Sequence, residues 1–205
     1  MTGGRWIALE GGEGSGKSTQ ARLLAAALGA VLTREPGGTG VGERIRSLLL
    51  DPALVVDDRA EALLMAADRA EHWRRVISPK LDTGQTVVSD RSAWSSLAYQ
   101  GHARGLDIDT VRQISDWALR GRWPDLAVLI DVPAPVVAQR LAEAGRAPDR
   151  LEGEGGGFHE RVRAGFAALA AGSPERWCVI DGTGTEAEVA ARVASSVRER
   201  LGLAH

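Results

Sequence analysis

The chain has 205 residues, of which 44% are hydrophobic and 25% are charged, as in an ordinary globular protein with one substantial core. Its formal net charge of -2 and its lack of a lysine cluster argue against a broad nucleic-acid interface, and no apolar run approaches membrane-spanning length. We therefore expect no membrane partner. Cys178 is the only cysteine, which excludes a disulfide framework, so we also expect a cytoplasmic protein.

The first expected element is a short apolar strand at 6–9, which a glycine-rich turn joins to an expected helix at 19–28. The turn fits the pattern G-x-x-x-x-G-K-[ST] and consists of Gly11, Gly12, Glu13, Gly14, Ser15, Gly16, Lys17 and Ser18. Its glycines let backbone N–H groups converge on phosphate, Lys17 adds a full positive charge, and Ser18 can place its hydroxyl on Mg²⁺. The turn therefore predicts nucleoside triphosphate binding; the alternative is a glycine-rich turn with an incidental lysine.

Further short apolar strands alternate with helical patterns along the chain. The other strands are expected at 30–33, 86–89, 126–131 and 177–180, and helices near 41–50, 57–80, 92–101, 109–121, 134–144, 158–171 and 185–201. This alternation predicts an α/β fold with a parallel sheet covered by helices on both faces. The glycine-rich turn places the fold in the P-loop class, and the length predicts a single domain, 1–205. Ligands are then expected at the carboxyl ends of the strands.

Acidic residues stand at the ends of two expected strands. Asp90 is placed to hold the water shell of Mg²⁺ across from the glycine-rich turn, and Asp131 is a competing candidate. Arg91 follows Asp90 and would pair with the phosphate of an acceptor, unless the two residues only form an ion pair with each other.

The segment from about 144 to 157 is rich in glycine and charge and lies between two expected helices. Arg146 and Arg150 on such a segment would make it a lid that closes over a triphosphate. The alternative is an inert surface loop.

The remaining pattern favours a small-molecule kinase. The chain has no asparagine and no [NT]-K-x-D motif, which argues against a GTPase, and it lacks the LSGGQ-like signature of transporter ATPases. A kinase whose acceptor is an ionised phosphate needs little general-base help, which agrees with four scattered histidines that suggest no catalytic base.

Several blocks make the chain resemble the thymidylate kinase family, and they run in family order across nearly the whole sequence. The blocks are 11–18, 33–39, 90–101, 124–132, 149–152 and 158–162. The resemblance implies transfer of a phosphoryl group from ATP to dTMP with Mg²⁺, giving dTDP for dTTP synthesis, on a five-stranded parallel core and usually as a homodimer. The alternatives are another nucleoside or nucleotide kinase of the same fold, or a nucleotide-binding protein without efficient transfer.

The resemblance also implies roles for single residues. Lys17, Arg91 and Glu13 would serve catalysis, and Arg140 would pack on the adenine of ATP. Glu13 would contact the sugar of dTMP, and Tyr99 would crowd the 2′ position. The full set implied for dTMP is Glu13, Met65, Arg69, Arg91, Ser96, Tyr99 and Gln100.

The chain departs from the family pattern at two places in the acceptor site. Met65 stands where a phenylalanine commonly stacks on thymine, and Ser92 stands where an aromatic residue commonly follows Asp-Arg. The P-loop also lacks the arginine that some members carry, so the lid is expected to supply the transition-state cation. Arg146 and Arg150 are the candidates, and Arg150 is favoured because Asp149 would place it.

Overall fold

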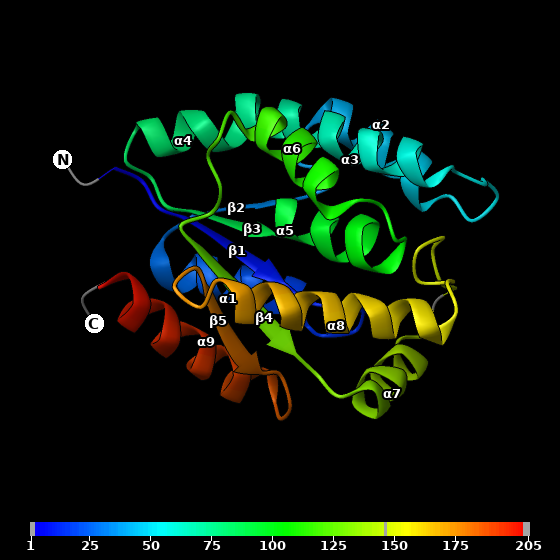
Figure 1. The fold of residues 1–205 in the computed structure, drawn as a ribbon. Coiled ribbons are helices and arrows are strands. Elements are labelled where there is room, and N and C mark those ends of the chain that lie inside the picture. The colour runs from blue at the N-terminus through cyan, green and yellow to red at the C-terminus, as the bar shows by residue number, and fades with distance from the viewer. Residues whose placement is uncertain (1–2, 146, 203–205) are drawn as a thin grey trace.

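The computed structural model describes residues 3–145 and 147–202, which form a central sheet with helices on both sides (Figure 1). Each expected strand is present within one residue of its expected bounds. The strands are β1 (Trp6–Glu10), β2 (Val31–Arg34), β3 (Val87–Asp90), β4 (Leu126–Asp131) and β5 (Trp177–Asp181). The helices are α1 (Lys17–Leu28), α2 (Gly40–Leu50), α3 (Asp58–His72), α4 (Ser78–Asp82), α5 (Ala93–Ser96), α6 (Ile108–Leu119), α7 (Ala134–Ala144), α8 (Gly156–Gly172) and α9 (Glu186–Leu201).

Two of the expected helices contain a π-helical turn. The pattern at 57–80 is α3 followed by the π-helical turn η1 (Trp73–Ile77) and α4, and the pattern at 92–101 is α5 followed by η2 (Leu97–Ala103). A π-helical turn changes the direction of the side chains that follow it, and such turns are frequent at functional sites. The sequence pattern did not predict these turns.

The five strands are parallel and lie in the order β2-β3-β1-β4-β5. The register pairs Leu9 with Asp90 and Arg34 with Asp90, so β1, β2 and β3 end at the same edge of the sheet. The connections that leave these strands therefore meet there, as expected for a parallel sheet.

Side chains of β1 alternate between two hydrophobic clusters because successive residues of a strand point to opposite faces. Ile7 and Leu9 pack in the cluster that includes α1 and α9. Trp6 faces the opposite side and packs with Trp73 of η1, at a ring-centroid distance of 5.8 Å. Burial on both faces explains why β1 and β4 read as continuous apolar runs.

Cys178 lies in β5, which is an edge strand, and burial raises the pKa of its thiol to about 11. In the described part of the chain, no helix is both long and apolar enough to cross a bilayer.

Candidate active site

The glycine-rich turn follows β1 and runs into the first two residues of α1, Lys17 and Ser18. Gly16 precedes the helix with φ 87, and no side chain of the described residues caps the helix N-terminus. Gly11 has φ 148, and a Cβ added there would lie 2.8 Å from Ser15 Oγ. The turn therefore needs glycine, and the free N–H groups of the first helical turn form a ready site for an anion.

Lys17 lies almost buried inside this turn. Its Nζ donates a hydrogen bond to Gly12 O at 3.3 Å and lies 3.7 Å from Glu13 Oε2. Burial and the nearby positive charge of Arg91 lower the pKa of Lys17. Phosphate oxygens would reverse both effects, since they solvate the ammonium group and add negative charge.

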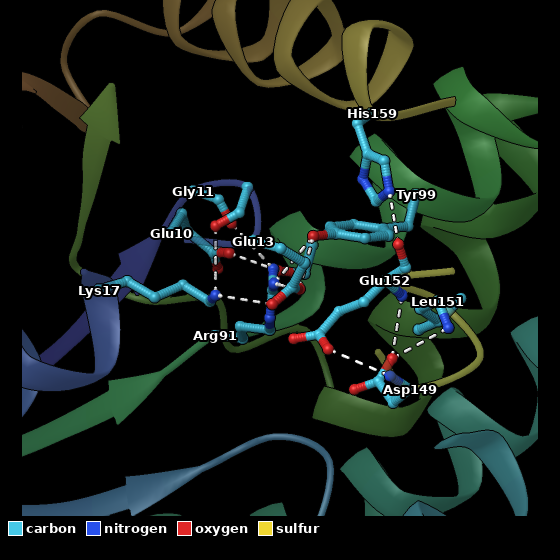
Figure 2. A network of polar contacts seen from close by, with 12 residues as sticks. Glu10, Gly11, Glu13, Lys17, Arg91, Tyr99, Asp149, Leu151, Glu152 and His159 are labelled. Carbon is cyan, nitrogen blue, oxygen red and sulfur yellow. Dashed lines mark hydrogen bonds and ion pairs between the residues drawn. The ribbon is translucent and has the colours of Figure 1, made fainter. Parts of the chain in front are cut away.

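Arg91 is the centre of a polar network at the end of β3 (Figure 2). Its NH2 group pairs with Glu13 Oε1 and donates to Tyr99 Oη at 2.8 Å, while NH1 donates to Gly11 O at 3.1 Å and to Ser95 Oγ at 3.0 Å. In the described residues its ion-pair partner is Glu13, so the alternative of an Asp90–Arg91 ion pair is wrong.

Glu13 joins the two cations of the site. Its Oε1 contacts Arg91 and accepts a hydrogen bond from Tyr99 Oη at 3.1 Å, and its Oε2 faces Lys17. Burial raises the pKa of Glu13, but Lys17 and Arg91 outweigh this effect and lower it to about 2. Glu13 is therefore ionised at neutral pH and holds Lys17 and Arg91 near each other.

Asp90 and Asp131 differ in whether their carboxylate oxygens have hydrogen-bond partners. Asp90 Oδ1 is buried and accepts no hydrogen bond from the described residues. Asp131 is half exposed, and both of its oxygens accept hydrogen bonds from Arg163, at 2.9 and 3.1 Å. The unpartnered carboxylate oxygen of Asp90 and the hydroxyl of Ser18 are both hard oxygen donors that fit Mg²⁺.

A cavity of about 340 Å³ lies between the glycine-rich turn, β3, α3 and η2. It brings together most of the residues that the sequence predicts for the site: Glu13, Lys17, Ser18, Met65, Arg69, Asp90, Arg91, Ser96, Tyr99 and Gln100. Residues as far apart in the sequence as 13 and 100 therefore face one space, which is large enough for a nucleotide base and sugar.

Arg69 lies at the floor of this cavity. Its guanidinium donates to Glu35 Oε2 at 3.1 Å, to Ser96 Oγ at 3.0 Å and to Ser115 Oγ at 3.3 Å. Glu35 Oε1 in turn lies 2.9 Å from His72 Nδ1. The family resemblance implied roles for Arg69 and Ser96 but gave none to the buried Glu35, which fixes the guanidinium plane, or to His72, which contacts Glu35.

Tyr99 reaches the cavity from η2, with its ring held edge-on by Phe158 and Phe166 at centroid distances of 6.0 and 6.2 Å. Gln100 follows it, and its Nε2 donates to the buried Glu61 Oε1 at 2.8 Å. Since a carboxylate only accepts hydrogen bonds, this contact fixes which end of the Gln100 amide faces Glu61. Gln100 Oε1 is buried and has no partner among the described residues.

Arg140 lines a second cavity of about 390 Å³ on the other side of the glycine-rich turn. Its guanidinium donates to Ser15 O at 3.2 Å and to Gly182 O at 2.9 Å. The arginine thus connects α7 both to the turn and to the loop after β5. This cavity adjoins the N-terminus of α1, where the residues expected to bind the donor nucleotide lie.

The segment between α7 and α8 contributes Asp149, Leu151 and Glu152 to the first cavity. Figure 2 shows the backbone turn that joins them, in which Asp149 Oδ1 accepts from the N–H groups of Leu151 and Glu152. Arg150 does not line that cavity, and its side chain contacts Glu61 and Leu49 rather than Asp149. Arg146 lies outside the described residues.

The family model for thymidylate kinase matches residues 9–193. The chain belongs to the thymidylate kinase family. It is 46% identical over 205 residues to a thymidylate kinase of Deinococcus radiodurans, with 98% of this chain and 99% of that protein covered. A thymidylate kinase of a Synechococcus strain is 50% identical over 206 residues, with 97% of each covered.

A solved structure supports the same assignment. The crystal structure of thymidylate kinase from Ehrlichia chaffeensis superposes with a TM-score of 0.79 at 33% identity, covering 96% of this chain and 99% of that one. The expected thymidylate kinase resemblance, the P-loop fold and the enzyme class are confirmed.

Proposed function

We propose that the chain transfers the γ-phosphoryl group of ATP to the phosphate of dTMP, giving ADP and dTDP. The observation that carries this proposal is that one cavity is lined both by Lys17 and Ser18 of the glycine-rich turn and by Arg91 of the Asp-Arg corner. Two phosphate chains bound there would meet end to end. Family membership supplies the acceptor, because the relatives are thymidylate kinases.

In this proposal an oxygen of the dTMP phosphate attacks the γ-phosphorus of ATP while the bond to the β–γ bridging oxygen breaks. The attacking oxygen is already ionised, so no side chain has to take a proton from it. Lys17 and Arg91 bind the donor and acceptor phosphates, and Glu13 keeps the two cations aligned. Positioning and charge neutralisation then supply most of the rate enhancement.

Mg²⁺ would be held by the hydroxyl of Ser18 and, directly or through water, by Asp90. When bound, the ion neutralises charge on the β- and γ-phosphates. The buried, unpartnered Oδ1 of Asp90 supports this assignment, since a buried carboxylate oxygen without a partner is costly unless a ligand satisfies it.

The acceptor would lie with its base over Arg69, Ser96 and Met65 and its sugar near Tyr99 and Glu13, with Gln100 beside the base. Arg69 has donors only, which suits a carbonyl oxygen of thymine. On the donor side, Arg140 would pack on adenine. The lid would comprise about 144–157, and the transition-state cation would come from Arg146 or Arg150.

We also propose a homodimer that forms through α3 and α6. These helices pack against each other, and they carry the exposed apolar side chains Leu63 and Trp117, at 59% and 82% exposure. In this proposal the two side chains belong to one apolar patch, because contiguous exposed apolar patches mark interfaces. Light scattering during size exclusion should give twice the mass of the 21.7 kDa chain, and Trp117→Glu should shift the mass to that of a single chain.

An acceptor screen tests the function directly. The protein with Mg-ATP is offered dTMP, dUMP, UMP, AMP and thymidine in turn, and ADP and the phosphorylated product are both quantified. We expect the highest kcat/KM with dTMP. Preference for thymidine would identify a nucleoside kinase instead, and absence of ADP release with every acceptor would identify a nucleotide-binding protein.

A further inference from the structure

Arg150 is held by residues of α2 and α3, next to the cavity proposed for dTMP. Its Nε donates to Leu49 O at 2.7 Å, its NH2 donates to Glu61 Oε2 at 2.6 Å, and its backbone N–H donates to Leu50 O at 3.1 Å. The side chain of Arg150 is 10% exposed and that of Glu61 is fully buried. Its neighbours Asp149 and Leu151 face the cavity, whereas Arg150 faces α2 and α3.

The cluster around Glu61 depends on the charge of Arg150. Arg104 lies 3.3 Å from Asp58, 3.1 Å from Glu61 and 2.6 Å from Glu154, so one guanidinium is shared by three carboxylates. Arg150 supplies the second positive charge of the group. Without it Glu61 would be a buried carboxylate with only a share of Arg104, and such stranded charges are strongly unfavourable.

Arg150 also completes the end of α2. The last carbonyl groups of a helix lack intrahelical partners and carry partial negative charge, which favours a cation there. The last turn of α2 contains no basic residue of its own, and the two carbonyls that receive Arg150 belong to Leu49 and Leu50. The 147–155 segment therefore supplies the C-terminal cap of a helix from the other wall of the cavity.

We propose that Arg150 is a latch that docks the 147–155 segment on Glu61 and the end of α2, and so closes the acceptor cavity, rather than the cation that reaches the transferring phosphoryl group. This inference rests on the proposed function only where it names the acceptor. Glu61 also receives Gln100 Nε2, so the same carboxylate connects the latch to the cavity wall beside the base. Arg150 is thus a positioning residue, and Arg146 remains the candidate cation of the lid.

Hydrogen exchange of the nucleotide-free protein tests the docking without any assumption about substrate. The variants are Arg150→Ala and Glu61→Gln, and the control is Glu71→Gln, which lies in α3 like Glu61 and loses an ion pair with Arg75 of η1. We expect exchange in peptides covering 147–155 to be about tenfold faster in both variants and unchanged in the control, because local opening sets amide exchange. Unchanged exchange in Arg150→Ala would overturn the proposal, and this variant decides the matter alone if Glu61→Gln does not fold.

Steady-state kinetics separate a latch from a transition-state cation. For Arg150→Ala we expect KM for dTMP to rise about tenfold, with KM for ATP unchanged and kcat lowered less than tenfold. A loss of kcat greater than tenfold at saturating dTMP and ATP would overturn the proposal and assign Arg150 to the chemistry. If the wild type did not phosphorylate dTMP, the proposed function would fail, while the exchange experiment would still decide the latch.

Discussion

Ser92 Oγ donates a hydrogen bond of 2.7 Å to Glu10 Oε1 and so joins the Asp-Arg corner to the end of β1. The other oxygen of Glu10 accepts from Ser95 Oγ at 2.5 Å, and Ser95 Oγ accepts from Arg91 NH1. At the position where the family commonly has an aromatic residue, this chain therefore has a hydroxyl that satisfies a fully buried carboxyl group. The serine at position 92 therefore has a specific hydrogen-bond partner, Glu10, in place of the contacts of an aromatic side chain.

Glu10 should make folding stability depend on pH. Burial raises the pKa of Glu10 from 4.5 to about 7, against the lowering effect of Ser95 and Ser92. Between these two values the folded protein keeps a proton that the unfolded chain releases, so rising pH favours unfolding. Between pH 5 and pH 8 the wild type should therefore lose on the order of 2 kcal/mol of unfolding free energy through Glu10. Glu10→Gln should not show this loss, because glutamine does not titrate.

Urea unfolding at several pH values measures this difference. The matched control is Glu199→Gln, because Glu199 is exposed in α9. A stability difference between Glu10→Gln and the wild type that stayed constant from pH 5 to pH 8 would show that Glu10 has the same pKa in the folded and unfolded states.

Removing either cation proposed to bind phosphate should abolish most of the activity. Lys17→Ala and Arg91→Ala should each lower the rate of dTDP formation by at least about 100-fold, because each deletes a positive charge aimed at a phosphate chain. The control is Lys80→Ala, since Lys80 is the only other lysine and is exposed. A loss below tenfold for Arg91→Ala would place the acceptor phosphate elsewhere.

Tyr99 should exclude ribonucleotides by the bulk of its ring. Tyr99→Ala should reduce the ratio of kcat/KM for dTMP over ribo-TMP by about tenfold or more, since it opens space near the 2′ position. Tyr99→Phe keeps the ring between Phe158 and Phe166 and loses only the hydroxyl that contacts Arg91 and Glu13. An equal change of the ratio in both variants would assign discrimination to the hydroxyl.

Asp90 should determine how much Mg²⁺ the reaction needs. Asp90→Asn removes the charge of the unpartnered carboxylate, so the Mg²⁺ concentration for half-maximal rate at fixed ATP should rise about tenfold. Asp131→Asn serves as control, because Asp131 is engaged with Arg163. If Asp131→Asn raised the requirement and Asp90→Asn did not, the metal would belong to the end of β4.

The features that the sequence predicted correctly are those with a local signature. Each strand is an apolar run, and both the glycine-rich turn and the Asp-Arg corner lie within a few consecutive residues. Parallel strands end at one edge of a sheet, so the strand pattern predicted Lys17 and Arg91 at the same edge. Their meeting in one cavity also requires that β1 and β3 are neighbours, which the structure shows. The glycine and charge content of 144–157 predicts a lid, but it did not predict the partner of Arg150.

The buried carboxylates were missed because their partners are distant in sequence. Glu10 bonds Ser95 across 85 positions, Glu35 bonds His72 across 37, and Glu61 bonds Gln100 across 39. A glutamate in a strand or helix pattern reads as solvated unless such a partner is known, since burial of a lone charge is unfavourable. The π-helical turn η2 was also unpredicted, and it carries both Tyr99 and Gln100.

The single thiol of the chain offers a practical advantage. Because only the thiolate reacts readily with maleimides and disulfide reagents, a group with a pKa of about 11 is nearly inert at neutral pH. Cys178 therefore need not be replaced before a fluorophore is attached elsewhere. A cysteine introduced at an exposed position such as Ala147 would be labelled selectively, and the dye would report movement of the arginine-bearing segment in an otherwise natural background.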